Sequence, residues 1–562
     1  MMGERTWDLI VKALEAEGVK YIFGLPGNPM ALYDSLYDSD IEPILVRHEG
    51  SGAFMAFAYS KLSREPGVCF GSPGPGVGNM VSGVLEAYSG CQPMVMLGAS
   101  VGIENEGKGA FQETPQMEIF RPITKWSHRV LQPSKAGWAI NRAFSQASNG
   151  QPGPVYIDVP FDVGQSLTQE QTYIKSDRPL RVRPDIEAVK KSADIILGAE
   201  RPVIVAGGGT YMSNSSNEIR ELAEALGIPV LTTPSGRGVI PEDHPLSLGL
   251  VGLYRTRVGK RVYQEADLLI SLGSRNEEFQ TAAWDYFPEG AKFIQVDIEA
   301  SELGRNWVPE VPVVGDVKLF LKDLMMVLEE KIKKKPLKEI PRVREIINAK
   351  RQFYSEITEE CLGTESVKSK RVVFEANRVF GRNTVLVNEN GSQDLWSYYS
   401  PYYRVLDIDG CVAPAEQTCM GLGVAGAIGA KLAAPERQII CTTGDGAFQM
   451  SMKELPTAVQ YNTPVTWIVL NNYSLGWIKL HQWANEERYI SVDYEAQPDF
   501  KGIAEASGCY GETIIEVKDI RPALESAKKE NSRGVPAVLD FHVESMDFPE
   551  GFKEFHPKIF SS

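Results

Sequence analysis

The sequence is poor in the side chains that bind zinc, and it has no long apolar run. Its 562 residues include 7 cysteines and 6 histidines. No two cysteines form a CxxC pair and none has a histidine cluster nearby, which excludes a zinc site of readable spacing and indicates reduced thiols. No apolar stretch reaches the about 18 residues that a membrane span needs. The N-terminus also lacks the apolar core of a secretion signal. We therefore expect a cytoplasmic protein with no membrane partner.

Positive charge is in deficit as well. The chain has 58 Lys and Arg against 73 Asp and Glu, a net charge of −15, which argues against a nucleic-acid partner. The most basic run, residues 329–339 (EEKIKKKPLKE), is interleaved with acids and is typical of a solvated linker. A polar stretch at residues 165–185 is predicted to be another linker. These linkers suggest domains at residues 1–180, 186–335 and 365–545, with a tail at 546–562.

Short apolar runs alternate with helical patterns through all three predicted domains. This alternation is typical of α/β domains built on doubly wound parallel sheets. The runs that we predict to be strands are residues 19–23, 67–71, 92–98, 154–160, 202–206, 229–232, 268–272, 292–296, 384–388, 438–443 and 465–470. A Gly/Ala-rich helix is predicted at residues 421–434, where small side chains require close packing against something flat.

Oxygen-bearing side chains follow two of these strands. The strand at 438–443 ends in Gly444-Asp445-Gly446, a helical pattern spans residues 448–458, and the strand at 465–470 ends at Asn471-Asn472. Because parallel strands end at the same sheet edge, Asp445 and Asn472 are expected to be neighbours. A carboxylate and an amide oxygen beside glycines suit a Mg²⁺ ion that holds a diphosphate. A tight glycine turn followed by an ordinary loop is the alternative.

The segment 444–477 resembles the GDG…NN signature of thiamine diphosphate (ThDP) enzymes. Three further motifs, IFGLPGNP (22–29), RHEGSGAFMA (47–56) and GSPGPGVGN (71–79), are similar to the acetolactate synthase (acetohydroxyacid synthase) group. Residues 109–127 (GAFQETPQMEIFRPITKWS) resemble the same group and its benzaldehyde lyase and 2-hydroxyacyl-CoA lyase relatives. The resemblance therefore covers nearly the whole chain.

The resemblance implies a role for each domain. Residues 1–180 would bind the pyrimidine of ThDP, residues 186–335 would form a central Rossmann-like domain, and residues 365–545 would bind the diphosphate. It also implies a homodimer or homotetramer with shared active sites, in which Glu49 of one subunit faces Asp445 and Asn472 of another. The tail is expected to be either a lid or a docked terminus.

The resemblance also implies which residues form the site. Asp445, Asn472 and the main-chain oxygen of Ser474 would ligate Mg²⁺, and Glu49 would hydrogen-bond the pyrimidine N1′. Taken alone, Glu49 is an ordinary first-turn carboxylate that complements a helix dipole. The expected catalytic residues are Glu49, Gln112 and His481. The other expected cofactor contacts are Pro26, Gly391, Ser392, Gln393, Met420, Gly444, Gly446, Ala447, Leu475, Gly476 and Trp477. The expected substrate pocket contains Asn28, Phe111, Gln112, Trp477 and His481.

The activity implied is decarboxylation of a 2-oxo acid such as pyruvate, with transfer of the resulting carbanion to a second carbonyl. A C–C lyase and a pyruvate oxidase-like flavoenzyme remain alternatives. His481 stands where acetohydroxyacid synthases have a tryptophan that recognises the acceptor, so the donor and acceptor stay open.

The sequence gives little support for a nucleotide in the central domain. Residues 273–278 keep only Arg275 of the Arg-Phe-Asp-Asp-Arg run of flavin-binding members, so bound FAD is not predicted. An ADP- or CoA-type anion is the alternative there. The glycines at 207–209 lack a full GxGxxG, and a nucleotide-binding protein without thiamine chemistry is the remote alternative.

Overall fold

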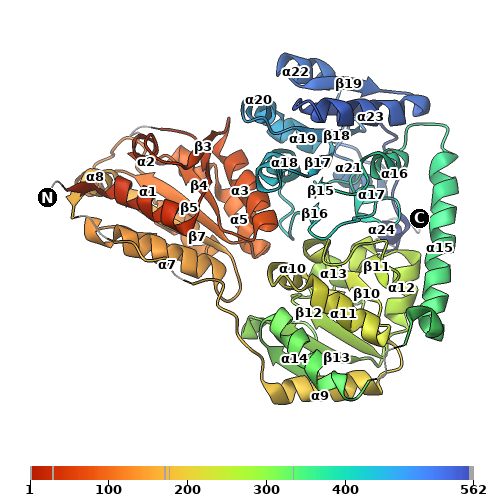
Figure 1. Ribbon diagram of the computed structural model, residues 1–562. Helices are drawn as coiled ribbons and strands as arrows, with labels where there is room; N and C mark the ends of the chain where they lie inside the picture. The colour runs from red at the N-terminus through yellow and green to blue at the C-terminus, as the bar shows by residue number, and fades with distance from the viewer. Residues whose placement is uncertain (1–2, 28–30, 170–171, 176, 333–334, 556–562) are drawn as a thin grey trace. The chain divides into compact units, whose positions relative to one another are not determined.

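The computed structural model describes residues 3–27, 31–169, 172–175, 177–332 and 335–555, and these form two compact units. One unit comprises Met1–Leu180, Gln417–Pro435 and Ser451–Thr463, and the other comprises Arg181–Glu416, Glu436–Met450 and Pro464–Ser562. The described strands include three six-stranded sheets (Figure 1). Every pairing within these sheets is parallel, which confirms the predicted fold class.

The first sheet has the strand order β3-β2-β4-β5-β7-β6. Its strands are β2 (Tyr21–Gly24), β3 (Glu42–Leu45), β4 (Gly67–Gly71), β5 (Met94–Ser100), β6 (Trp126–Arg129) and β7 (Pro154–Pro160). Helices α1 (Thr6–Glu17) and α7 (Ala136–Ser148) supply much of the apolar core on one face, with Leu14 and Phe144 buried. Helix α3 (Glu49–Ser63) follows β3 and carries Glu49 at its first position.

The expected linker at 165–185 is not wholly irregular. Its residues Leu167–Thr168 form strand β8, which pairs antiparallel with β1 (Glu4–Arg5) near the N-terminus. The pairing is only two residues long, and no apolar alternation marks it in the sequence.

The central sheet has the order β11-β10-β9-β12-β13-β14. Its strands are β9 (Pro202–Ala206), β10 (Val230–Thr232), β11 (Ser247–Leu250), β12 (Leu268–Leu272), β13 (Lys292–Asp297) and β14 (Val311–Val314). The order reverses between β9 and β12, where ligands bind in many α/β proteins. Here a Cβ on Gly207 would lie 2.3 Å from the main-chain oxygen of Gly273, so the glycines allow two turns to pack closely.

The third sheet has the order β16-β15-β17-β18-β20-β19. Its strands are β15 (Thr384–Asn388), β16 (Cys411–Val412), β17 (Gln438–Gly444), β18 (Val465–Asn471), β19 (Tyr510–Ile514) and β20 (Ala537–His542). Strands β17 and β18 pair in parallel with Gly444 opposite Leu470. The two strands therefore end together, and the expectation for the segments that follow them is confirmed.

The helical pattern at residues 448–458 does not form one helix, so that prediction was wrong. Helix α19 (Asp445–Ser451) gives way to a 3₁₀ turn (Met452–Glu454) and then to α20 (Leu455–Gln460). Pro456 lies at the start of α20. Because proline has no N–H to donate to the preceding turn, it is tolerated at a helix start but not inside one.

Helix α18 (Leu422–Ala433) confirms the predicted Gly/Ala-rich helix and its close packing. It packs along α3 in the same unit. A Cβ on Gly429 would lie 2.1 Å from the main-chain oxygen of Met55, so only glycine allows this approach. The small residues of α18 are thus explained by contact with the helix that carries Glu49.

The described part of the tail is docked. Phe548 and Phe552, the latter on helix α24 (Glu550–Phe555), are 3% and 0% exposed. Their rings stack with centroids 5.3 Å apart. Among the described helices, none combines the length and apolar character needed to cross a membrane.

Candidate active site

Three oxygen atoms converge where β17 and β18 end. Asp445 is 1% exposed at the start of α19, and Asn472 is 6% exposed just after β18. The side-chain oxygen of Asn472 lies 2.9 Å from the main-chain oxygen of Ser474 and 3.1 Å from Oδ1 of Asp445. Adjacent ligands of an octahedral Mg²⁺ with bonds of about 2.1 Å are about 3.0 Å apart. The two spacings from the Asn472 oxygen therefore fit a cation of that size.

The donor set is also chemically suited to magnesium, which prefers oxygen ligands. An Asn472 amide turned by 180° would donate hydrogen bonds to the same two oxygens, so the three groups meet in either orientation. Burial raises the pKa of Asp445 to about 6. A divalent cation would favour the ionised carboxylate. In the part of the chain that the structure describes, no group of three or more His, Cys, Asp and Glu side chains could hold a metal.

The loop after β15 lies beside residues 472–476, which we call the metal loop because Asn472 and Ser474 are expected to bind Mg²⁺. A Cβ on Gly476 would lie 2.2 Å from Oγ of Ser392, so residue 476 must be small for the two segments to meet. A Cβ on Gly391 or Gly444 would meet no atom within 4 Å, which leaves open space beside both turns. The side chain of Gln393 accepts from Ser369 Oγ at 2.6 Å and donates to Ser545 O at 2.9 Å. These bonds anchor the loop and engage the side chain of Gln393. A cofactor contact at this residue would therefore be made by its main chain.

The buried carboxyl of Asp394 accepts hydrogen bonds that hold the loop after β15 in place. Asp394 is fully buried, and burial raises its pKa to about 7. Its Oδ2 accepts from the Glu389 N–H at 2.9 Å, and its Oδ1 accepts from Ser397 Oγ at 2.8 Å. Ser397 in turn accepts from Nδ2 of Asn388, the last residue of β15, at 2.6 Å. The sequence analysis did not single out Asp394.

Glu49 is 9% exposed at the first position of α3. The helix is capped by His48, whose ring accepts from the Gly50 N–H at 3.1 Å. Asn79, just after helix α4 (Pro75–Gly78), donates from Nδ2 to Oε2 of Glu49 at 2.9 Å. Asn79 lies in a motif that the sequence analysis quoted, yet it was not recognised as the residue that orients Glu49.

The other predicted residues of the N-terminal domain are spread over loops. Phe111 is 76% exposed, and Gln112 next to it has a φ of 63°, a left-handed conformation that few side chains adopt. Pro26 is exposed after β2, and Met420 is partly exposed just before α18. Asn28 lies outside the described residues.

Helix α21 (Gly476–Ala484) carries both Trp477 and His481. The Trp477 ring lies 4.8 Å from the Phe552 ring and 6.3 Å from the Phe279 ring, so the tail covers part of it. His481 is exposed on the same helix. Leu475 donates its N–H to Val492 O, and Ala447 is buried in α19.

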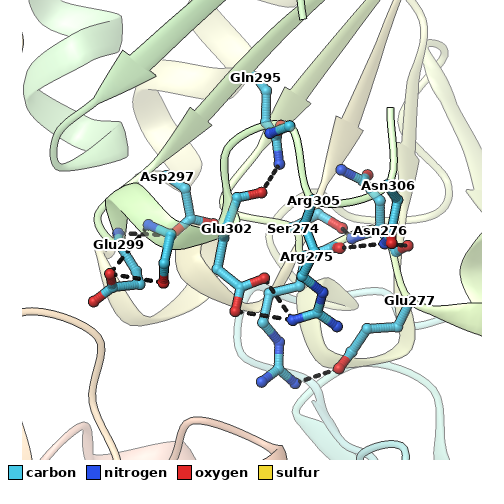
Figure 2. Close-up of polar contacts among 12 residues, drawn as sticks. Ser274, Arg275, Asn276, Glu277, Gln295, Asp297, Glu299, Glu302, Arg305 and Asn306 are labelled. Atoms are coloured by element: carbon cyan, nitrogen blue, oxygen red, sulfur yellow. Dashed lines mark hydrogen bonds and ion pairs between the residues drawn. The ribbon is translucent and has the colours of Figure 1, made fainter. Parts of the chain in front are cut away.

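At the run that contains Arg275, the central domain holds its arginines in ion pairs. Figure 2 shows the two cations of this edge turned toward neighbouring acids. Arg275 pairs with Glu277 at 2.7 Å, and Arg305 pairs with Glu302 at 2.7 Å. Asp297, at the end of β13, is buried, which raises its pKa to about 6.

The glycine turn after β9 uses two of its backbone donors within the protein. The N–H groups of Gly207 and Gly209 donate to Leu272 O and Gly273 O, both at 2.9 Å. These main-chain bonds close the turn against the end of β12.

Comparison with known sequences agrees with this geometry. Residues 5–119, 189–324 and 391–541 match the N-terminal TPP binding domain, the central domain and the C-terminal TPP binding domain of thiamine pyrophosphate enzymes. The chain is 35% identical to a probable acetolactate synthase large subunit of Methanocaldococcus jannaschii, covering 96% of this chain and 91% of the relative.

Two further relatives extend the comparison. The acetolactate synthase large subunit of Pyropia yezoensis is 34% identical, over 92% of this chain and 89% of the relative. The acetolactate synthase of Mycobacterium bovis is 32% identical, over 95% and 87%. The three matched domains and these full-length relatives show that the chain belongs to the thiamine diphosphate-dependent enzymes, in the acetolactate synthase-like family.

Proposed function

We propose that the protein is a ThDP- and Mg²⁺-dependent carboligase that decarboxylates a 2-oxo acid such as pyruvate and joins the product to a second carbonyl. The convergence of the Asp445, Asn472 and Ser474 oxygens at spacings of 2.9 and 3.1 Å carries this proposal. The acetolactate synthase relatives support the substrate class.

When bound, ThDP supplies an electron sink that makes loss of CO₂ from a 2-oxo acid feasible. The protein's part is to hold and orient groups. Asp445, Asn472 and Ser474 would hold the metal, and the loop at 391–393 would receive the diphosphate. Glu49, oriented by the hydrogen bond from Asn79, would hold a proton at the pyrimidine N1′. Such positioning contributes several kcal/mol to catalysis in general.

The substrate side of the site is proposed to contain Phe111, Gln112, Trp477 and His481, together with Asn28. Gln112 would hydrogen-bond a substrate carbonyl or hydroxyl. His481 would exchange a proton with the reacting oxygen, a role that imidazole side chains often have in enzymes. An imidazole in place of the indole expected there would give the acceptor a polar neighbour.

We also propose that active sites are completed between copies of the chain, with Glu49 of one copy serving the metal site of another. Two inactive variants test this, Glu49→Gln and Asp445→Asn. Mixed and reassociated, they should recover about a quarter of the unaltered activity, because half of the dimers would be mixed and each would have one intact site. A mixture that stays inactive, with exchange of subunits verified by mass, would contradict shared sites.

The reaction itself is tested by product identification. The protein is incubated with ThDP, Mg²⁺ and a panel of 2-oxo acids, each alone and with aldehydes, and products are identified by mass. A C–C coupled hydroxy-keto product from pyruvate is expected. Cleavage of 2-hydroxy ketones without any coupling would replace the proposal with the lyase alternative.

A further inference from the structure

A glutamine outside the metal loop touches the carboxylate that is proposed to bind Mg²⁺. Gln497 lies in the segment before α22 (Phe500–Ala506). Its Nε2 donates to Oδ2 of Asp445 at 2.7 Å and to Oδ1 of Asn471 at 3.0 Å. Its Oε1 accepts from Nε2 of Gln449 at 3.2 Å. The amide is therefore held from three sides, and its two donors both point toward the metal loop.

The partners of Gln497 are themselves fixed at the ends of neighbouring strands. Asn471 is the last residue of β18 and is 1% exposed, and its Nδ2 donates to Oδ1 of Asp540 on β20 at 3.0 Å. The other carboxylate oxygen of Asp540 lies 3.2 Å from Nε2 of His542. Because the Asn471 amide nitrogen faces a carboxylate, its oxygen must face Gln497. Donation therefore runs from Gln497 through Asn471 to Asp540 on one side, and from Gln497 to Asp445 on the other.

The backbone places Gln497 as firmly as the side chains do. Ser474 bridges antiparallel to Asp493. Leu475 donates its N–H to Val492 O at 2.8 Å, and Tyr494 donates its N–H to Tyr473 O at 2.9 Å. The segment that leads to Gln497 is therefore hydrogen-bonded through its main chain to the loop that contains Ser474.

The two oxygens of Asp445 consequently have different neighbours. Oδ2 accepts from Gln497, whereas Oδ1 lies 3.1 Å from the side-chain oxygen of Asn472. A carboxylate with one oxygen so occupied presents the other one alone to a cation. Hydrogen-bonded partners of this kind orient metal ligands, and their loss commonly weakens metal binding about 10- to 100-fold.

We infer that Gln497 is a positioning residue of the metal site, which holds Asp445 so that Oδ1 alone ligates the divalent cation. The inference rests on the proposed function, because it requires that the site binds a metal with ThDP. Gln497 itself does not touch the reacting atoms. It acts through Asp445.

Mn²⁺ binding to the full-length protein in the presence of ThDP tests the inference. The free ion is measured by its electron paramagnetic resonance signal. Gln497→Leu, which keeps the size of the side chain but removes both donors, should raise the Kd for Mn²⁺ about 10- to 100-fold. Activity of this variant should return at high Mg²⁺ concentration, since the defect lies in metal affinity and not in chemistry. A purely structural role would not be rescued by metal.

Gln482→Leu is the matched control. The Gln482 amide bonds both the N–H and the carbonyl of Ile490 in the same region, at 2.7 and 3.0 Å, but in these bonds reaches no metal ligand. Its Kd for Mn²⁺ should stay within about twofold of the unaltered protein. Gln449→Leu, which frees only the oxygen of Gln497, should raise the Kd about two- to fivefold and decides the question if Gln497→Leu does not fold.

Two outcomes would overturn the inference. Mn²⁺ binding by Gln497→Leu within about threefold of the unaltered protein would show that Asp445 needs no such support. An unaltered protein that takes up no Mn²⁺ with ThDP would remove the proposed function, and the inference with it. Normal Mn²⁺ binding by the unaltered protein separates the first outcome from the second.

Discussion

Gly476 lies where the loop proposed to hold Mg²⁺ meets the loop at 391–393 that is proposed to receive the diphosphate. Adding a single methyl group there should therefore weaken cofactor binding. In Gly476→Ala the new Cβ would lie 2.2 Å from Ser392 Oγ and 2.8 Å from Asn472 Nδ2. Ordinary contacts between such atoms are about 3.4 Å or longer. The Ser392 hydroxyl must therefore turn away, and the Asn472 amide, which is proposed to bind Mg²⁺, must shift by about 0.6 Å. Overpacking of this size costs about 1–3 kcal/mol, which corresponds to an affinity loss of about 5- to 150-fold.

The assay is a ThDP titration at saturating Mg²⁺, followed by tryptophan fluorescence, with Trp477 next to the altered residue as reporter. Gly198→Ala is the control, because a Cβ there would meet no atom within 4 Å. We expect a weaker Kd for Gly476→Ala and an unchanged one for the control. A folded Gly476→Ala protein that binds ThDP within twofold of the unaltered protein would refute the reasoning.

Three further predictions concern stability and the tail. Burial raises the pKa of Asp394 to about 7, above its ordinary value of about 4, so its stabilising contribution is present below about pH 4 and is lost as the pH rises through about 7. Asp394→Asn should therefore flatten the fall in thermal midpoint between about pH 4 and pH 7, and an equally steep fall would contradict the assignment. Arg237 and Glu242 pair at 2.9 Å and are 0% and 3% exposed. Arg237→Met should cost about 3–5 kcal/mol in denaturant unfolding, and Glu242→Leu added to it should restore part of that loss. Phe552→Ala should expose the Trp477 ring and shift its fluorescence to the red, whereas an unshifted spectrum would show that the tail is not packed against it.

The fold and the metal loop could be predicted because both depend on local patterns. Short apolar runs between helical stretches specify parallel strands, and parallel strands end at one edge. That rule alone placed Asp445 near Asn472, which the 3.1 Å separation of their oxygens bears out. The break in the helix after β17 was also readable, since Pro456 cannot occupy a helix interior. The break was missed because the apolar residues keep a helical spacing across it.

The supporting polar residues could not be predicted in the same way. Asn79, Asp394 and Gln497 are single side chains in or beside loops, with no periodic signal around them. Each acquires its role from a residue that tertiary folding brings near, for example Asn79 from Glu49, 30 positions earlier. The packing of α18 against α3 could not be predicted either, because small residues indicate close packing but do not identify the element that packs against them. The domain boundaries and the roles of Gln112 and His481 stay predictions.

The most direct test of the thiamine site is exchange of the C2 proton of bound ThDP for deuterium, followed by rapid quench and NMR. The unaltered protein with Mg²⁺ should exchange this proton far faster than free ThDP does. Glu49→Gln, with ThDP still bound, should exchange it no faster than free ThDP. Rapid exchange retained by Glu49→Gln would contradict the role of Glu49, and slow exchange in the unaltered protein would contradict the proposed function itself.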